Sequence, residues 1–511
     1  MGRNIVFVTT DQQRYDSLGC NGGTVARTPT IDGLAARGIV YDRAHPQNVV
    51  CMPSRSTMLT GQYVRTHGVW MNGVPLPDDA PSVAEVLHGA GYNTALIGKA
   101  HFEPFLDPTL QFAENRMGVQ GTFGPHRGFD HMETATHTAM GMTHYAQMMM
   151  RGHSEYVNDW YRVLDADFDV NAAGGGDTGA CQVWRNAVPR DLYHTDWVAQ
   201  RTIAWLDSLP ADADFFVWVS FPDPHHPWDP PASETRRVDW RDLDLPTNYP
   251  TTAAERDAIL DAKPRHWRGY YDGALAANYE APRKFVPAQL TADQIREVNA
   301  MTHVENELID EACADILGAV ARRGWQDRTD VFFTTDHGEL QGDFGLLFKG
   351  AYHCDALMRL PLIWRPAASA DVAASRVGRP VGLLDLAPTW CAIAGVDAPD
   401  WMEGRALPVD DADADARGFE HVVTEWDSVY EDIAMHLQTV ATERWVCTQY
   451  EPGTVHDGTE GELYDLVDDP LQRVNRWDDP ACRATRDELL ERLRATLPER
   501  RGEPAPVVAN V

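Results

Sequence analysis

The sequence predicts an α/β protein with a mixed, mostly parallel sheet flanked by helices, followed by a smaller C-terminal antiparallel sheet plus helix. The first indication is the run Asn4–Thr10, which is almost entirely apolar and β-branched, as in a parallel strand buried on both faces. The second is the alternation of such runs with helical segments through residues 1–400. The third is a group of short strand-like runs within residues 417–511, which ends in one helical pattern.

Each further strand of the main sheet is predicted from a strand-length apolar run. These strands are expected at Ile39–Asp42, Thr94–Gly98, Phe215–Ser220, Asp330–Thr335, Arg359–Ile363 and Arg379–Leu384. Start and stop residues predict helices at Thr28–Gly38, Pro53–Gly61, Ser82–Ala90, Thr195–Leu209 and Thr291–Arg323. The last of these helices begins with a capping box of Thr291 and Gln294 and is ended by Gly324.

An acidic, Pro- and Asp-rich stretch from Pro399 to about Asp415 divides the chain. We therefore expect a main domain at residues 1–400 and a small C-terminal α+β subdomain at residues 417–511. Two irregular insertions, at about 103–191 and 232–290, should line a site or form a subunit contact, so we expect a homo-oligomer. The C-terminal elements are expected at Val422–Trp426, Gln438–Ala441, Trp445–Tyr450, Glu462–Leu466 and Asp487–Leu497.

Charge and composition exclude several classes of partner. The 511 residues carry a net charge of −32, which disfavours binding to nucleic acid or to an anionic membrane surface. There is no transmembrane run, and the apolar segment Ile5–Val8 is too short for a signal peptide, so we expect a cytoplasmic protein. The eight cysteines lack paired spacing, which argues against a disulfide framework or a structural zinc site.

The negative charge also means that an anionic substrate must be held by local cations. Lysine supplies only four of the 44 basic residues, and two of these four, Lys99 and Lys349, fall in motifs with other polar residues. In a chain that otherwise uses arginine, a lysine at such a place indicates that a compact point charge is required there.

Four predicted strands each end in a chemically capable residue: Asp11, Lys99, His225 or Asp336. In an open parallel α/β sheet, ligands bind beyond the carboxyl ends of the strands. A single aspartate after a strand is often a helix cap, but four such residues, each beside another titratable group, indicate an active site.

The segment Val49–Gly61 provides a nucleophile for that site. Pro53 suits the first turn of a helix, which places Cys51 at the positive end of the helix dipole. Arg55, one turn later, offers a planar fork of donors to an oxyanion at the same place.

The motif Cys51-x-Pro53-x-Arg55, followed by Leu59-Thr60-Gly61, resembles the signature of type I sulfatases. The resemblance implies an alkaline-phosphatase-like fold and oxidation of Cys51 to formylglycine by a formylglycine-generating enzyme. In that family the hydrated aldehyde is the nucleophile.

Further motifs extend the resemblance along most of the chain. Lys99-Ala-His101 resembles the family's Lys-x-His, in which lysine contacts sulfate and histidine assists breakdown of the hemiacetal. The family's Pro-His-x-Pro motif is matched by Pro224-His225-His226-Pro227, and its Gly-x3-Lys-x2-Tyr motif is matched around Lys349. The resemblance implies that His225 and Lys349 both contact the leaving-group oxygen. Asn72 matches a polar substrate-binding position of phosphonate hydrolases.

Asp11, Gln12, Asp336 and His337, together with residue 51, are the candidate metal ligands. Oxygen ligands with one imidazole suit one divalent ion, Ca²⁺ or Mn²⁺, whereas Mg²⁺ fits less well and zinc is disfavoured. Sulfatases typically carry Asp-Asp and Asp-Asn at these places. This chain carries Asp11-Gln12 and Asp336-His337 instead, which resemble the metal ligands of the phosphonate monoester hydrolase branch of the superfamily.

We therefore expect a sulfuric ester hydrolase that acts on small-molecule sulfate esters, with aryl sulfates favoured and promiscuous phosphonate or phosphodiester hydrolysis. A phosphonate monoester hydrolase or phosphodiesterase is the nearest alternative. A metal-dependent phosphomutase would carry Ser or Thr in place of Cys51. An anion-binding, non-enzymatic descendant would be expected to lack at least one of these groups.

Overall fold

An eight-stranded sheet forms the centre of the computed structural model, in the order β5-β4-β6-β1-β7-β8-β2-β9. The structure describes residues 2–107, 109–139, 141–161, 176–275, 285–430, 433–500, 502 and 504–508. The strands of this sheet are β1 (Asn4–Thr10), β2 (Ile39–Tyr41), β4 (Asn93–Gly98), β5 (His131–Thr134), β6 (Phe215–Ser220), β7 (Thr329–Thr335), β8 (Leu362–Arg365) and β9 (Ser375–Val377).

All neighbouring strands of this sheet pair in parallel except β8, which is antiparallel to both β7 and β2. This arrangement confirms the mixed, mostly parallel sheet that the sequence predicts. The central strand β1 lies between β6 and β7, so the ends of β4, β6, β1 and β7 are adjacent along one edge.

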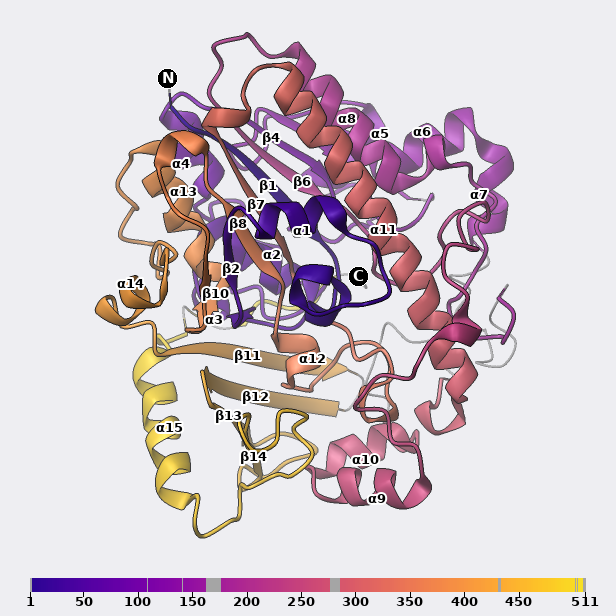
Figure 1. Cartoon of the computed structure of the whole chain (residues 1–511), viewed down its shortest axis with the longest axis vertical. Helices are drawn as coiled ribbons and strands as arrows, with labels where there is room; N and C mark the ends of the chain where they lie inside the picture. Colours follow the sequence, from indigo (N-terminus) through magenta and orange to yellow (C-terminus); the bar gives the residue numbers. More distant parts are fainter. Residues whose placement is uncertain are drawn as a thin grey trace.

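Alternate residues of β1 enter two different hydrophobic cores, which explains why the strand is apolar throughout. Val6 and Val8 pack in one core, whereas Ile5 and Phe7 pack in the other. Figure 1 shows α11 crossing the face of the sheet on the side of α8 and α1. The first face is covered by α1 (Pro29–Ala35), α8 (His194–Ser208) and α11 (Ala292–Arg322), and the second by α2 (Cys51–Thr60), α4 (Val83–Gly89) and α13 (Leu386–Ala394).

The segment 103–191, expected as an irregular insertion, in fact supplies the edge strand β5 of the main sheet. It also contains α5 (Ala113–Gln120), α6 (His144–Gly152) and α7 (Ser154–Tyr161). The segment 232–290 contains α9 (Ala253–Asp261) and α10 (Arg265–Tyr271). Within the two expected insertions, residues 108, 140, 162–175 and 276–284 lie outside the described residues.

Two expected strands of the main sheet differ from the prediction. The strand expected at Arg359–Ile363 begins only at Leu362, because Pro361 has no N–H to donate to a ladder and Leu360 instead bridges to Ala44. The strand expected at Arg379–Leu384 is the short β10 (Val381–Gly382), which pairs with β3 (Ala44–His45) in a separate two-stranded sheet.

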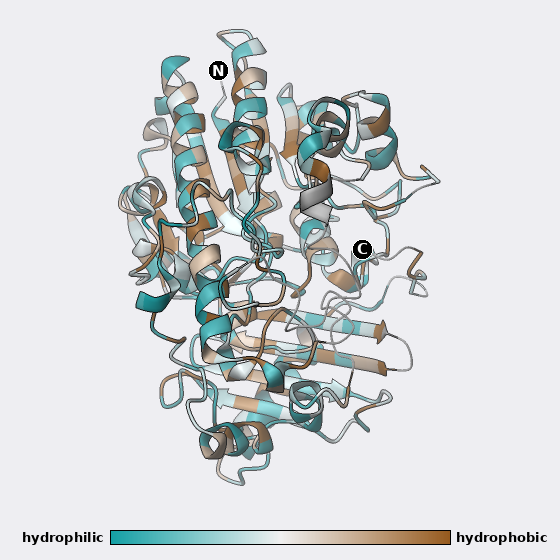
Figure 2. Cartoon of the chain, turned by 90° about the vertical axis from the view of Figure 1, so that its right-hand side faces the viewer, coloured by the Kyte–Doolittle hydropathy of each residue, from teal (hydrophilic) through white to brown (hydrophobic). Residues whose placement is uncertain are grey.

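The C-terminal part forms a four-stranded antiparallel sheet, as predicted. Its elements are β11 (His421–Tyr430), β12 (Ile433–Thr442), β13 (Trp445–Glu451), β14 (Gly461–Asp465) and the helix α15 (Arg483–Thr496). One face of this sheet packs on α15 through Leu489 and Leu493. The other face packs on a core that includes Val49 and Val50, directly before α2. Figure 2 shows the alternating apolar and polar residues along these strands.

Lys263 joins the segment 232–290 to the C-terminal sheet. Its ammonium lies over the rings of Trp267, Phe344 and Tyr464, at 4.2, 4.4 and 4.6 Å from their centroids. It also donates to the Tyr464 hydroxyl (2.8 Å) and to the carbonyl of Gln472 (2.9 Å). A lysine enclosed by aromatic faces is held by cation–π attraction, which strengthens where water is excluded.

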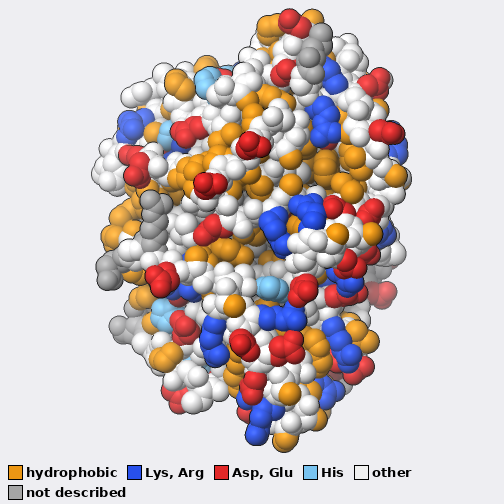
Figure 3. All heavy atoms as spheres, turned by 90° about the vertical axis from the view of Figure 1, so that its left-hand side faces the viewer, with side chains coloured by type: hydrophobic (Ala, Val, Ile, Leu, Met, Phe, Trp, Pro, Cys, Tyr) orange, Lys and Arg blue, Asp and Glu red, His pale blue; other side chains and the backbone are white. Residues whose placement is uncertain are grey.

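The surface carries acidic and basic side chains interspersed with apolar ones, as the face in Figure 3 shows. Among the described helices, none has the length and apolar character needed to cross a membrane.

Candidate active site

Helix α2 begins at Cys51, so this residue lies at the N-terminus of the helix as predicted. Val50 precedes it in an extended conformation, and Gly61 ends the helix with a positive φ of 65°. The Cys51 side chain is buried, with 1% of the residue exposed. Asn72 accepts a hydrogen bond from the Met52 N–H at 2.9 Å, so it satisfies one of the donors that the start of a helix leaves without an intrahelical partner.

The strand ends meet at Cys51. Lys99, after β4, places its Nζ 2.5 Å from Oδ2 of Asp11, which follows β1. The Cys51 Sγ lies 3.7 Å from the Lys99 Nζ and 3.6 Å from Asp11 Oδ1. Asp336, after β7, and His225, after β6, complete the set. The carboxyl ends of β4, β6, β1 and β7 therefore place their polar residues at one site.

Arg55 is fully buried and uses its fork of donors on the protein itself. Its Nε donates to Asp336 Oδ2 (2.8 Å), and one terminal nitrogen donates to Asp11 Oδ2 (3.3 Å). The other terminal nitrogen donates to the Lys99 carbonyl (2.7 Å) and to Ser220 Oγ (2.8 Å). The sequence suggested that Arg55 contacts the substrate. In the structure it orients the two carboxylates and adds charge beside the site.

Asp11, Cys51, Asp336 and His337 offer ligand atoms that all lie within 4.8 Å of one another. His337 Nδ1 is 3.0 Å from the Gly338 carbonyl, and because a carbonyl only accepts, this nitrogen carries the proton. His337 Nε2 is then left with its lone pair, 3.2 Å from Cys51 Sγ. Two carboxylates and a correctly oriented imidazole around residue 51 are a donor set that fits a divalent cation.

Gln12, the remaining predicted ligand, lies beside this cluster with its side chain bound to protein groups. Its Oε1 accepts a hydrogen bond from Lys349 Nζ at 2.5 Å, and its Nε2 contacts Glu339 and His226. Its backbone N–H donates to Asp336 Oδ1 at 3.1 Å. Gln12 therefore links the candidate metal ligands to Lys349.

The site is locally cationic although the protein is strongly acidic. Burial by itself would raise the pKa of Asp11, but the charge of Lys99, together with that of Arg55, holds this pKa well below its usual range. Burial and then Asp11 raise the pKa of the Cys51 thiol to about 12, so an unmodified thiol here stays protonated and is a weak nucleophile.

His225 and Lys349 form a hydrogen-bonded pair. His225 Nδ1 donates to the carbonyl of His226, which leaves Nε2 as an acceptor 2.9 Å from Lys349 Nζ. Burial and then the charge of Lys349 hold the pKa of His225 well below its usual range. In this arrangement the proton of the pair lies on the Lys349 ammonium.

His101 is 2% exposed, and neither of its ring nitrogens has a hydrogen-bond partner among the described residues. Burial and then the charge of Lys99 hold its pKa well below the usual range, so the ring is neutral. Its backbone has a positive φ of 58°, which is rare for a residue other than glycine. Such a conformation persists only where the surroundings enforce it.

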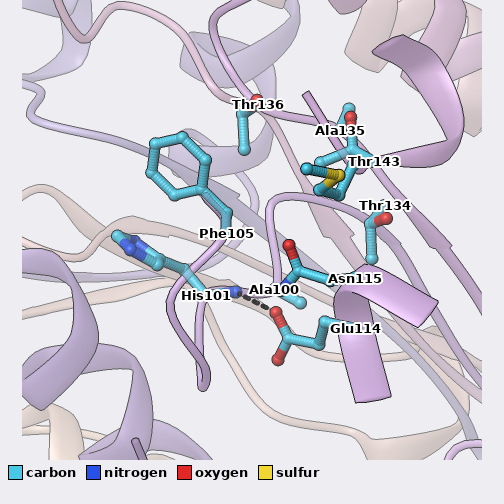
Figure 4. A pocket seen from close by; sticks show the side chains of 10 residues that line it. Ala100, His101, Phe105, Glu114, Asn115, Thr134, Ala135, Thr136 and Thr143 are labelled. Atoms are coloured by element: carbon cyan, nitrogen blue, oxygen red, sulfur yellow. Dashed lines mark hydrogen bonds between the residues drawn. The ribbon is translucent and has the colours of Figure 1, made fainter. Parts of the chain in front are cut away.

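The Glu114 side chain provides that support (Figure 4). Its two carboxyl oxygens accept hydrogen bonds from the N–H groups of His101 (3.2 Å) and Phe102 (3.1 Å). Figure 4 shows the His101 ring directed away from Glu114 and toward the side of Phe105. The pocket beside them has a volume of only about 10 Å³, close to that of one water-sized sphere.

Three further groups lie at the site that the sequence reasoning did not assign. Burial raises the pKa of Glu339 and of Asp223 to about 7 in each case. Glu339 follows His337 closely and Asp223 precedes Pro224, so position next to a motif was the available signal for both. His137 stacks on His225 at 4.3 Å, but it comes from the weakly periodic segment after β5, where no pattern indicates it.

The fold and this site define an alkaline-phosphatase-like hydrolase. Residues 3–396 match the family model Sulfatase, and residues 342–499 match the model N-sulphoglucosamine sulphohydrolase, C-terminal. The chain belongs to the sulfatase family. It is a sulfuric ester hydrolase.

Relatives span nearly the whole chain. The chain is 26% identical over 499 residues to the uncharacterized sulfatase YidJ of Escherichia coli (strain K12), covering 96% of this chain and 86% of that protein. It is 26% identical to an arylsulfatase of Clostridium perfringens (strain 13 / Type A), covering 80% and 78%. The crystal structure of the phosphonate monoester hydrolase of Agrobacterium radiobacter has a TM-score of 0.76 at 24% identity, covering 97% and 95%.

Glu114 should make the stability of the protein fall as pH rises. Burial and then the charge of Glu103 raise its pKa from 4.5 to about 8. Between these pH values the folded state holds a proton that the unfolded state has released, so the free energy of unfolding decreases as pH increases. A difference of one between the folded-state and unfolded-state pKa corresponds to about 1.4 kcal/mol of stability.

The measurement is the urea unfolding midpoint of the wild type and of Glu114→Gln between pH 5 and pH 8. Because glutamine does not titrate, the wild type should lose stability relative to Glu114→Gln across this range. Glu85→Gln, at an exposed position of α4, is the matched control and should follow the wild type. Parallel curves for the wild type and Glu114→Gln would contradict the expectation.

Proposed function

We propose that the protein hydrolyses sulfate monoesters, with aryl sulfates preferred, and that formylglycine formed from Cys51 is its nucleophile. The observation that carries the proposal is the position of Cys51, at a helix N-terminus and beside Lys99, with the Asp11, Asp336 and His337 ligand atoms around it. A helix N-terminus and fixed cations favour an anionic group that develops charge during transfer. A buried thiol with a pKa of about 12 supports conversion to another nucleophile.

Asp11, Asp336 and His337 would hold one divalent cation, Ca²⁺ or Mn²⁺, beside residue 51. Gln12, expected from the sequence as a further ligand, lies next to them with its side chain bound to Lys349, Glu339 and His226. When bound, such an ion stabilises negative charge on a transferred group and favours a deprotonated nucleophile. The chain itself adds two positive charges beside Asp11 Oδ2, from Lys99 at 2.5 Å and from Arg55 at 3.3 Å.

The Lys349–His225 pair is placed to protonate the departing oxygen. The imidazole of His225 is fixed as an acceptor at Nε2, so the mobile proton of the pair is on Lys349. As the sulfur–oxygen bond breaks, the leaving oxygen takes the electron pair and receives this proton, directly or through His225 Nε2. Protonation of the leaving oxygen, expected from the sequence for His225, is therefore shared between His225 and Lys349.

His101 is the candidate base for the step that releases sulfate. Its ring is neutral and its nitrogens have no described partner, so it can accept a proton from a hydroxyl at residue 51. The Glu114 carboxyl group fixes the backbone of His101.

Hydrolysis of phosphonate monoesters or phosphodiesters is the second candidate function. The pairs Asp11-Gln12 and Asp336-His337 favour it, because they resemble the metal ligands of phosphonate hydrolases. Lys99 and His101 favour a sulfate ester, since phosphonate monoester hydrolases carry Tyr and Thr at these two places.

The first prediction for this function concerns the nucleophile. Protein that is coexpressed with a formylglycine-generating enzyme should carry an aldehyde at position 51, measured as the intact mass of the peptide around it. Cys51→Ala should lose nearly all turnover and keep its fold, whereas Cys447→Ala, at a buried cysteine of the C-terminal sheet, should keep both. A fully active preparation with only unmodified cysteine would exclude the formylglycine mechanism.

The second prediction concerns the metal. Asp336→Asn preserves the volume of the side chain but removes a charged ligand, so bound metal and turnover should both fall strongly. Elemental analysis of the purified protein measures the metal. Asp330→Asn, a buried position near the other end of the same strand β7, is the control and should keep its metal. A stoichiometric ion in Asp336→Asn would contradict the assignment.

The third prediction concerns the ester. The kcat/KM for an aryl sulfate should exceed that for the matching aryl phosphonate or phosphodiester, because lysines and a histidine face a singly charged transferred group. Exchange of Lys99→Tyr together with His101→Thr should narrow or invert this preference. If the wild type hydrolyses the phosphodiester more efficiently than the sulfate, the second candidate function replaces the first.

A further inference from the structure

The His225 ring lies between two other imidazole rings. On one face it stacks on His137, with ring centroids 4.3 Å apart and planes at 10°. On the other face it stacks on His226, at 4.0 Å and 28°. These three side chains are 4–8% exposed, so the stack is shielded from water. Contact on both faces leaves only the edges of the His225 ring open to hydrogen bonds.

Aromatic residues hold each outer ring of this stack. Phe105 meets His137 edge-on, at 6.0 Å and 83°. Phe348 meets His226 edge-on, at 4.7 Å and 76°. Edge-to-face contacts of this kind favour one ring orientation over others. Neither outer ring can rotate without losing such a contact, so both present a fixed face to His225.

The two outer rings reach His225 from different parts of the chain. His226 is its neighbour after β6, whereas His137 follows the edge strand β5, with β4 between the two strands. His137 therefore crosses the end of β4 to cover the His225 ring. Burial is the largest cause that holds the pKa of His137 well below its usual range, so it is a neutral ring that adds no charge repulsion.

We propose that His137 and His226 are positioning residues that clamp the His225 ring from both faces and keep its Nε2 directed at Lys349 and the leaving oxygen. This inference rests on the proposed function, in which the Lys349–His225 pair supplies the leaving-group proton. Proton transfer depends steeply on donor geometry, and a displacement of about 1 Å costs up to 10²-fold in rate.

Comparison of His137→Ala with His137→Phe tests the clamp, because phenylalanine keeps a stacking face but has no ring nitrogen. The substrates are phenyl sulfate, whose poor leaving group needs the proton, and 4-nitrophenyl sulfate, whose good leaving group needs it little. His137→Ala should lower kcat for phenyl sulfate about tenfold more than for 4-nitrophenyl sulfate, with KM nearly unchanged. His137→Phe should restore the ratio of the two kcat values to within about threefold of the wild type.

His456→Ala is the control for loss of a buried histidine outside the site. His456 is 3% exposed and packs 4.5 Å from Tyr450 in the C-terminal part. Any decrease in kcat of this variant should be equal for phenyl sulfate and 4-nitrophenyl sulfate. The proposal is overturned if His137→Ala lowers kcat equally for both substrates. It is also overturned if His137→Phe lowers kcat in the same way as His137→Ala, because the effect would then belong to a ring nitrogen.

Crystal structures of the two variants give a readout that needs no turnover. The 2.9 Å contact between His225 Nε2 and Lys349 Nζ should persist in His137→Phe and be lost in His137→Ala. Its survival in His137→Ala would refute the clamp. Absence of sulfatase activity in the metal-loaded, formylglycine-containing wild type would refute the proposed function instead, and the crystallographic comparison would still test the clamp.

Discussion

The site depends on the buried fork of Arg55. Its guanidinium holds α2 against the ends of four neighbouring strands through Asp11, Asp336, Ser220 and the Lys99 carbonyl. A charge in a dry interior is tolerated only if it is paired and hydrogen-bonded, and loss of one partner of such a pair costs about 3–5 kcal/mol. The planar fork suits this task because it presents several donors in fixed directions, which a lysine ammonium cannot do. Arg55 thereby fixes the position of Cys51 relative to the carboxylates.

The same network resolves the conflict between an anionic substrate and a net charge of −32. Exposed charges more than a Debye length away, about 8 Å at physiological ionic strength, are largely screened. Lys99, Lys349 and Arg55 are 0–1% exposed, so their fields at the site are screened much less. The buried cations therefore decide the local potential, and the acidic surface has little influence there.

The C-terminal sheet contributes to the site although none of its residues was predicted to take part in the chemistry. Its apolar face packs on Val49 and Val50, and the backbone of Glu425 in β11 donates to the Gln47 carbonyl at 2.9 Å. The C-terminal sheet thus packs on the segment that leads into Cys51 and holds it in place. The match of residues 342–499 to a sulfohydrolase C-terminal model agrees with a catalytic unit that includes both parts of the chain.

Local patterns in the chain were sufficient to predict the sheet class, most element positions and the set of polar strand ends. They sufficed because a buried strand must be apolar throughout and a helix must begin and end at capping residues. The hydrogen bonds, the proton position and the ring contacts among these residues became apparent only from the three-dimensional structure. The donors of Arg55 bind protein groups, and the proton of the Lys349–His225 pair lies on the lysine. His137 covers His225 from a segment after the edge strand β5, which the sequence pattern predicted to be irregular. These facts depend on contacts between residues far apart in the chain, and periodicity carries no information about such contacts.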